Sequence, residues 1–298
     1  MYYRRKLLLS VLEEFGESLT TTSLQKILFL VTRKQDNKSF DFVPYKFGSY
    51  SFQANQDLMT LSKKGFLKDT STSNGIKWML KSKDKFFQQL KKEEQSAIKS
   101  TKREIKGLTQ KELVKYTYIQ FPYWAIKSQI ADDILDKKEL EKVISQKRNI
   151  DKPGFFTIGY EGVSLESYLN KLIINDVKLL CDVRKNPLSM KYGFSKNQLK
   201  NACESIGITY KHVPQLGIDS EKRNGLKTMS DYNKLFDEYE KTTLVENHDF
   251  LIQISNLATE YKRMAITCFE KEACMCHRSI VAKSLKALPS WSIEQKNL

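Results

Sequence analysis

The sequence predicts an α/β protein in which a small helical domain precedes a parallel sheet covered by helices on both faces. Beyond residue 153, short apolar strands alternate with amphipathic helices, which is typical of a parallel sheet. Before residue 85 the helices come first and a single hairpin follows them. The chain has 298 residues, of which 40% are hydrophobic and 29% charged, so it can form two domains with separate cores.

The first 85 residues have the element order of a winged helix. Gly16 ends the first predicted helix, and the residues before the second and third helices are good caps. Asn74-Gly75 is a strong turn signal between two strand-like segments. We therefore expect the third helix to enter a groove and the hairpin to flank it. The expected elements are a helix over 3–15, a helix capped by Ser18 or Thr20, an extended piece over 42–48, a helix capped by Ser51, and a hairpin over 66–80.

Positive charge is concentrated in the N-terminal half of the chain. The whole chain has a formal charge of +15, of which residues 1–150 carry +12. Such a footprint is typical of a protein that binds a polyanion, although lysines that only keep a surface hydrated are the alternative. The lysines of the hairpin and its flanks are the expected phosphate contacts. They are Lys63, Lys64, Lys68, Lys77, Lys81 and Lys83. Residues 86–150 are predicted to be a basic helical connector.

Two segments of this N-terminal domain carry a resemblance to a known group. They are Ser23-Leu-Gln-Lys26-Ile-Leu-Phe-Leu30 and Tyr45-Lys-Phe-Gly48-Ser-Tyr50-Ser51. Both are similar to the winged-helix modules of the SocA-like antitoxin (Panacea) group. The resemblance implies a winged-helix module that acts in a toxin–antitoxin or defence setting.

Residues 151–298 are predicted to form a Rossmann-like domain in which polar side chains follow each strand. We expect strands over 155–158, 177–181, 208–213 and 263–268, with helices between them. The carboxyl ends of parallel strands meet at one edge of the sheet, so side chains distant in sequence converge there. The expected catalytic residues are Glu161, Asp182, Cys268, Glu270 and His277. The expected substrate-binding residues are Tyr160, Arg184, Tyr210, His212, Cys276 and Arg278.

Three of the five cysteines lie between residues 268 and 276. Cys268 precedes a loop that leads into a helix, a position that lowers a thiol pKa and favours a nucleophile; a buried thiol that shapes the loop is the alternative. The spacing Cys274-x-Cys276-His277 differs from the usual zinc pairs, and no second pair exists in the sequence. We therefore expect neither a metal nor another cofactor. The side chains of Asp182 and Arg184 project from the same face of a strand. An ion pair that stabilises the carboxyl end of the sheet is therefore as good an interpretation as catalysis.

The C-terminal motifs resemble the family called domain of unknown function 488, over about residues 153–290. The matching pieces are Thr157-Ile-Gly159-Tyr160-Glu161-Gly162, Asp182-Val-Arg184-x-x-Pro187-x-Ser189, Gly193-Phe194-Ser195, Gly207-Ile-x-Tyr210-x-His212, Leu216-Gly217 and Cys268-x-Glu270-x5-Cys276-His277-Arg278. Cys274 is additional to that pattern. The resemblance implies a shared site but names no reaction. The chain is more loosely similar to rhodanese domains, and the nine residues between Cys268 and Arg278 argue against their chemistry.

Together these features predict a nucleic-acid-associated enzyme of bacterial repair or defence that processes a base or a nucleotide. The expected partner is a nucleic acid, with DNA as the first choice; a homodimer is allowed, and no membrane is involved. Two alternatives stay open: a DNA-binding regulator that senses a small ligand, and a toxin–antitoxin or defence component that acts by protein contact. An odd number of cysteines and no signal-like start predict a cytoplasmic protein.

Overall fold

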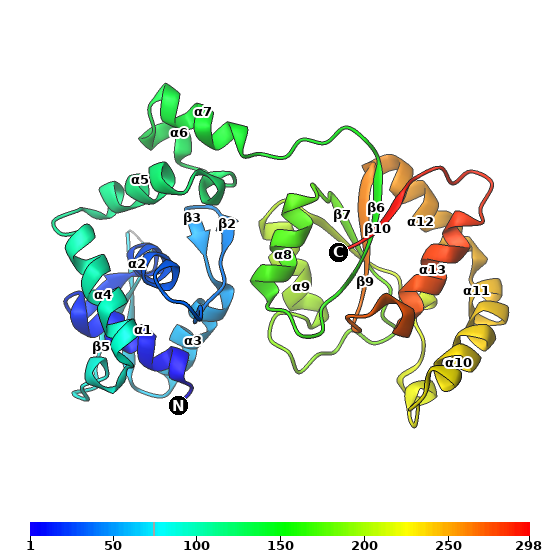
Figure 1. Cartoon of the computed structure of the whole chain (residues 1–298), viewed down its shortest axis with the longest axis horizontal. Coiled ribbons are helices and arrows are strands. Elements are labelled where there is room, and N and C mark those ends of the chain that lie inside the picture. Colours follow the sequence, from blue (N-terminus) through cyan, green and yellow to red (C-terminus); the bar gives the residue numbers. More distant parts are fainter. Residues whose placement is uncertain (74) are drawn as a thin grey trace. The chain divides into compact units, whose positions relative to one another are not determined.

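The computed structural model describes residues 1–73 and 75–298, and the chain divides into two compact units, Met1–Lys147 and Arg148–Leu298 (Figure 1). The predicted Asn74 turn lies outside the described residues. Within the described part of the chain, no helix is both long and apolar enough to cross a bilayer.

The N-terminal unit is mainly helical and contains two small antiparallel sheets. β1 joins the hairpin as a third strand, in the order β1-β5-β4, and β2 pairs with β3. The side chains of Thr20 and Ser51 cap α2 and α3, which confirms these two predicted caps. The elements are α1 (Tyr3–Glu14), β1 (Ser18–Thr20), α2 (Thr21–Arg33), β2 (Val43–Tyr45), β3 (Gly48–Tyr50), α3 (Phe52–Lys63), β4 (Leu67–Thr72), β5 (Gly75–Leu80), η1 (Phe87–Gln89), α4 (Lys92–Glu104), α5 (Gln110–Gln120), η2 (Pro122–Ala125), α6 (Ala131–Ile134) and α7 (Lys137–Ser145).

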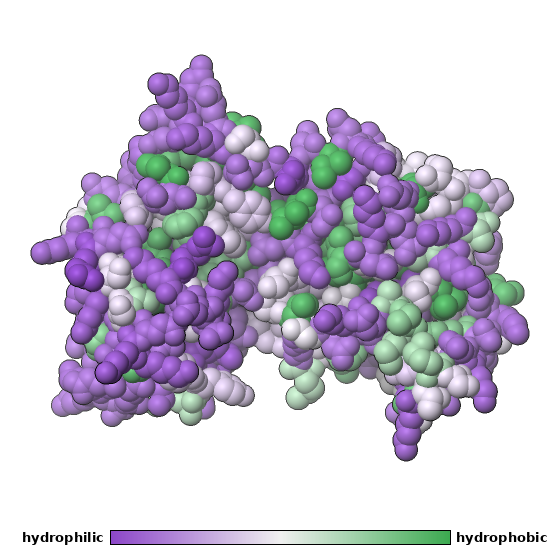
Figure 2. Space-filling view, viewed as in Figure 1, coloured by the Kyte–Doolittle hydropathy of each residue, from purple (hydrophilic) through white to green (hydrophobic). Residues whose placement is uncertain are grey.

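Residues beyond 85 contribute to the core of this same unit. Phe29 on α2 meets the rings of Phe121 and Trp124 edge-on, each at 5.2 Å between centroids. Helices α4 and α5 lie against α2. Residues 86–147, which were expected to belong to a connector, thus pack against the first helices and form one unit with them. The face of the unit seen in Figure 2 is mostly hydrophilic, as its lysine content implies.

The C-terminal unit is a five-stranded, fully parallel sheet in the order β10-β6-β9-β7-β8, with helices on both faces. This confirms the predicted fold class. α8 and α9 cover one face, and α12 and α13 cover the other (Figure 1). The elements are β6 (Gly154–Gly159), α8 (Leu165–Ile174), β7 (Leu179–Asp182), α9 (Lys196–Ser205), β8 (Thr209–His212), η3 (Pro214–Leu216), η4 (Ser220–Arg223), α10 (Met229–Lys241), α11 (Thr243–Glu246), α12 (His248–Tyr261), β9 (Arg263–Cys268), η5 (Ala273–Met275), α13 (His277–Lys286) and β10 (Gln295–Asn297).

The register of this sheet places the predicted polar residues along one edge. Gly159 on β6 pairs with Cys268 on β9, and Asp182 on β7 lies between Thr267 and His212. All of β9 is buried because it occupies the centre of the sheet. Its last residue, Cys268, pairs with β6, and the preceding Thr267 pairs with β7, so the end of the strand is held from both sides where the chain leaves the sheet.

Candidate functional site

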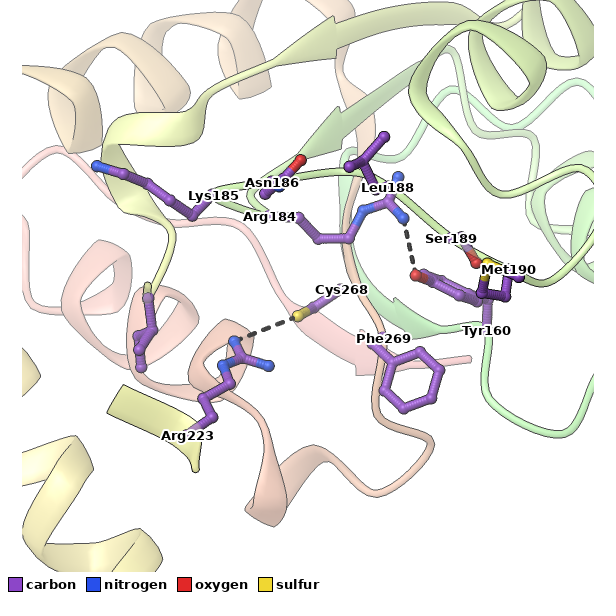
Figure 3. A pocket seen from close by; sticks show the side chains of 11 residues that line it. Tyr160, Arg184, Lys185, Asn186, Leu188, Ser189, Met190, Arg223, Cys268 and Phe269 are labelled. Atoms are coloured by element: carbon purple, nitrogen blue, oxygen red, sulfur yellow. Dashed lines mark hydrogen bonds between the residues drawn. The ribbon is translucent and has the colours of Figure 1, made fainter. Parts of the chain in front are cut away.

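A cavity of about 270 Å³ opens at the carboxyl ends of β6, β7 and β9 (Figure 3). Its floor includes Cys268, and its walls combine aromatic, cationic and apolar side chains. Leu188 and Met190 at its mouth are 78% and 104% exposed, so they are available to a bound molecule. The lining residues are Tyr160, Arg184, Lys185, Asn186, Leu188, Ser189, Met190, Ile218, Arg223, Cys268 and Phe269.

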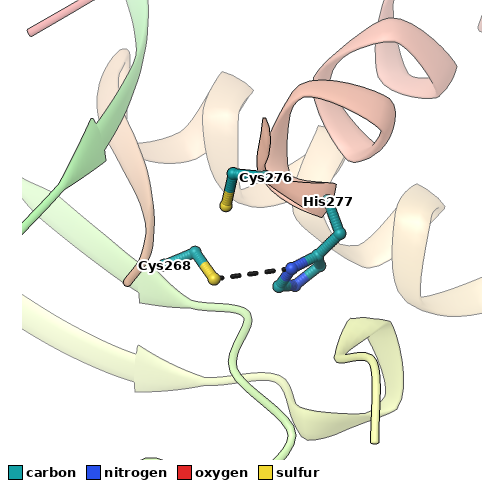
Figure 4. Close-up of side chains that lie close together, drawn as sticks. All are labelled: Cys268, Cys276 and His277. Carbon is teal, nitrogen blue, oxygen red and sulfur yellow. Dashed lines mark hydrogen bonds between the residues drawn. The ribbon is translucent and has the colours of Figure 1, made fainter. Parts of the chain in front are cut away.

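Cys268 forms the centre of a cluster of titratable side chains. Its Sγ atom lies 3.3 Å from Glu270 Oε2 and 3.4 Å from His277 Nδ1. Cys276 immediately precedes α13 and His277 begins that helix, so the loop after β9 returns both side chains to the strand end (Figure 4). Cys268, Cys276 and His277 are all buried. The sequence predicted Cys268, Glu270 and His277 as catalytic and Cys276 as substrate-binding, and the structure brings these four side chains together.

Arg223, from the loop after β8, provides a positive charge inside this cluster. Its Nη1 donates to Glu270 Oε1 at 2.5 Å, and its Nη2 donates to His277 Nδ1 at 2.8 Å. The same Nη2 lies 4.0 Å from the sulfur of Cys268. Arg223 therefore connects the buried cluster to the cavity that it also lines.

The cluster perturbs the pKa values of its members in opposite directions. Burial raises the pKa of the Cys268 thiol, but the hydrogen bond of Cys276, the neighbouring His277 and the guanidinium of Arg223 together hold it well below its ordinary value. The pKa of Glu270 is raised, mainly by burial and then by Cys268, against the lowering effect of Arg223. The pKa of Cys276 is raised well above its ordinary value, mainly by burial. A thiolate and a carboxylate so close to one another share protons rather than ionise independently.

Asp182 and Arg184 form a second, separate network at the carboxyl end of the sheet. Arg184 Nη1 donates to Tyr160 Oη and to Phe194 O, both at 2.8 Å. Tyr210 donates its hydroxyl to Asp182 Oδ2 at 2.6 Å, and burial, followed by the charge of Asp182, raises the pKa of Tyr210. His212 Nε2 donates to the carbonyl of Arg184 at 2.8 Å. This network holds Tyr160 and Arg184 as cavity walls, while Asp182, Tyr210 and His212 support them from behind.

Arg278 and Glu161 contact the loop backbone rather than the cavity. Arg278 Nη1 donates to the carbonyl of Glu270 and Nη2 to that of Lys271, the latter at 2.9 Å. Among the described residues, its buried Nε has no hydrogen-bond partner. Glu161 is exposed and accepts from Lys271 N at 3.0 Å. Both side chains thus hold the loop that carries Glu270.

The six lysines expected to contact phosphates are all exposed in the N-terminal unit. Lys68 pairs with Met79 across the hairpin, and Thr70 pairs with Lys77. Cross-strand partners share a face of a sheet, so Lys68 and Lys77 point to the same side. Trp78 and Leu67 take the other side and are buried.

Sequence reasoning missed Arg223 and Phe269. Arg223 belongs to the polar run Asp219-Ser-Glu-Lys-Arg-Asn-Gly225, which is typical of an exposed turn. Its position after the third strand of the sheet was the available signal, because the segments after the other strands also carry polar side chains of the site. Phe269, between two chemically distinctive residues, contacts Tyr160 edge-on at 5.3 Å.

Comparison with known proteins matches part of the chain to a family model whose activity is not described. Residues 164–285 match the model of the family described as Domain of unknown function DUF488, which confirms the resemblance of the C-terminal motifs. The match includes the Asp182, Arg223 and Cys268 segments. No curated protein matches the chain.

Proposed function

We propose, from the premise that residues 164–285 form a DUF488 domain, that this domain is an enzyme that processes a base or nucleotide of a nucleic acid held by the N-terminal unit. One observation carries the proposal: Cys268 and Arg223 line a cavity at the carboxyl end of a parallel sheet, and both contact Glu270 and His277. Ligands of open α/β sheets bind at this edge.

The size and lining of the cavity favour a small planar substrate. Its volume of about 270 Å³ lies just below the roughly 300–1,000 Å³ of drug-sized ligand pockets. Phe269, which is 41% exposed, offers aromatic surface for a flat ring, and Lys185 and Arg223 offer positive charge for a phosphate or a carbonyl oxygen. Enzymes that act on a base take it out of the stack and hold it between aromatic and apolar side chains.

Glu270 is the side chain that we assign to proton transfer. It lies beside Cys268 and is held by Arg223, so its carboxyl group is fixed within the cluster. A fixed carboxyl next to a substrate pocket can receive a proton from the attacking group and return it to the leaving group. Arg223 would hold negative charge that develops on the substrate.

The basic hairpin of the N-terminal unit would bind the nucleic acid that carries the substrate. Three helices followed by a hairpin, with exposed lysines on its outer face, support a winged-helix mode of binding. Contacts of this type are to phosphates, which position a protein on nucleic acid without reading its sequence.

The test compares two carboxylates of one loop. Mixed-sequence DNA and RNA oligonucleotides, single-stranded and duplex, are incubated with the full chain, and their nucleosides are then quantified by mass spectrometry. We expect one nucleoside to be removed or converted by the wild type and by Glu272→Gln, an exposed neighbour. Conversion by Glu270→Gln should be slower by roughly 10²-fold or more. Unchanged nucleosides in every sample that binds the chain, or equal rates for the two variants, would refute the proposal.

A further inference from the structure

We propose that Cys268, Cys276 and His277 bind a zinc-type divalent metal ion. The binding site itself is inferred from the geometry of these three side chains. A catalytic role for the bound metal rests on the proposed function. The sequence argued against a metal because Cys274-x-Cys276-His277 is not a usual ligand spacing. In the fold, Cys274 is exposed, and Cys268, eight residues before Cys276, takes its place beside Cys276 and His277.

The three ligand atoms lie close to one another (Figure 4). The two sulfur atoms and the nearer imidazole nitrogen are all within 4.8 Å of one another, and Cys268 Sγ is 3.4 Å from His277 Nδ1. Zinc–sulfur and zinc–nitrogen bonds of about 2.3 and 2.1 Å place tetrahedral ligands roughly 3.5–3.8 Å apart. Only small side-chain movements therefore separate this arrangement from a coordination shell.

His277 is held as metal-binding histidines are held. Its Nε2 donates to the backbone carbonyl of Val183 at 3.0 Å, which directs Nδ1 toward the two sulfur atoms. Such a bond from the second ring nitrogen to a carbonyl fixes the orientation of most ligating histidines. The ring is completely buried and contacts Tyr239 edge-on at 5.8 Å. The bond to Val183 thus satisfies the buried Nε2 atom and leaves Nδ1 on the side of the two sulfur atoms.

The identity of the donors selects the class of metal. Two thiolates and an imidazole suit zinc, whereas magnesium and calcium prefer oxygen ligands. Arg223 now donates to His277 Nδ1, so metal binding requires that bond to break; its bond to Glu270 can persist. The metal ion would then supply the positive charge that the guanidinium of Arg223 now supplies beside His277.

Three protein ligands leave a fourth position of zinc open to water, and the open site is next to the cavity that Cys268 lines. Glu270 is beside this site and is not one of the three ligands. In hydrolysis, the oxygen of that water bonds to a carbon of the base, and the bond from this carbon to its leaving nitrogen breaks. The proton lost by the water passes through Glu270 to that nitrogen. Two cysteines and a histidine that hold zinc, with an adjacent glutamate that transfers protons, are a known arrangement for such chemistry on bases.

The experiment measures bound metal rather than activity. The full chain is produced with added zinc, dialysed under reducing conditions, and its metal content is determined by mass spectrometry. We expect about one zinc per chain for the wild type and for Cys274→Ser, the matched control on the same loop. Cys268→Ser, Cys276→Ser and His277→Ala should each lose most of it.

A second measurement uses the wild type only, so it does not depend on the folding of variants. Cobalt is titrated into metal-free protein, and thiolate-to-cobalt charge-transfer bands are expected in the absorption spectrum. Zinc should also protect Cys268 and Cys276, but not Cys274, from alkylation. A wild type that stays metal-free with reduced thiols, or a Cys274→Ser variant that loses metal as Cys276→Ser does, would overturn the site. Stoichiometric zinc without base conversion refutes the proposed function alone, and base conversion by zinc-free protein refutes only the catalytic role of the metal.

Discussion

Arg184 and Asp182 form a two-point ion pair that is almost completely removed from solvent. Arg184 Nε donates to Asp182 Oδ1 at 2.8 Å and Nη2 donates to Oδ2 at 2.5 Å, while the side chains are 6% and 0% exposed. The pair lies at the end of β7, where Arg184 forms part of the cavity wall and Asp182 lies behind it. This geometry indicates a structural role, in which the pair stabilises the end of β7. A structural role can be tested by the effect of a substitution on the stability of the C-terminal unit.

Asp182→Asn should destabilise the C-terminal unit by about 3–5 kcal/mol, because it leaves the Arg184 charge buried without a partner. Hydrogen-exchange mass spectrometry on peptides of β7 and β9 reports this unit separately. Glu204→Gln is the control, since it removes an exposed pair with Lys200 at 3.9 Å and should change stability by less than about 0.5 kcal/mol. Equal protection in the two variants would contradict the assignment.

Lys26 makes the stability of the N-terminal unit dependent on pH. The side chain is buried and donates to Ser49 O at 2.8 Å, and burial lowers its pKa from 10.5 to about 7. Between these values the unfolded chain binds a proton that the folded chain does not. The free energy of unfolding should therefore rise by up to a few kcal/mol from pH 7 to about pH 10.

Chemical denaturation at several pH values measures this rise, with Lys26→Met as the reference that lacks the titrating group. Tyr118, which lies nearby, stays neutral over the range because burial raises its pKa to about 12. The difference between the two curves isolates Lys26. Curves that run parallel from pH 7 to pH 10 would show that Lys26 remains charged in the folded unit.

Lys68 and Lys77 should contribute to nucleic acid binding mainly through charge. The triple variant Lys68→Gln, Lys77→Gln, Lys81→Gln should bind a duplex oligonucleotide more weakly, and the slope of log affinity against log salt should fall by about 1 for each phosphate that the variant no longer neutralises. Fluorescence anisotropy at several salt concentrations gives both quantities. Lys137, Lys138 and Lys142 on α7 are also exposed, so their replacement by Gln removes the same charge elsewhere. If the α7 variant weakens binding as much, the hairpin is not the surface that binds nucleic acid.

Gly159→Ala should displace the loop that carries Glu270. A Cβ atom at Gly159 would lie 1.9 Å from the carbonyl oxygen of Glu270, so the loop after β9 or the end of β6 must move. We expect a clear decrease in thermal stability and faster proteolysis within residues 269–276. Gly162→Ala meets no atom within 4 Å and is affected only through its φ of +75°, which costs about 1 kcal/mol. A stable Gly159→Ala chain with an intact loop would contradict this packing.

The parallel sheet was predictable because its central strands are apolar runs bounded by turn residues. The predicted strand over 263–268 coincides with β9, and the other three agree within two residues at each end. β10 was missed because Gln295-Lys-Asn297 has no strand-like composition; it forms because the edge of β6 offers it hydrogen bonds. β2 and β3 were expected as one extended piece, and the turn between them is recognisable only from their pairing.

The site was predictable as a set of strand ends but not as a set of contacts. Cys268, Glu270 and His277 are close because the loop after β9 folds back, and nothing in the residue spacing specifies that path. Arg278 and Asp182 have the residue types of ligand-binding groups, yet their hydrogen bonds go to the protein itself. A charged side chain near a strand end can bind a ligand or satisfy a backbone, and only the positions of neighbouring atoms distinguish these uses.

The position of β9 also affects when the C-terminal unit can fold during synthesis. β9 lies between β6 and β7, although 80 residues, 183–262, separate it from β7 in the chain. During synthesis from the N-terminus, β6, β7 and β8 leave the ribosome without the strand that joins them, whereas the N-terminal unit already has all of its core. Non-local pairing of this kind is slow and leaves apolar edges uncovered. The cluster around Cys268 can thus form only after β9 and α13 have been made, later than the basic hairpin.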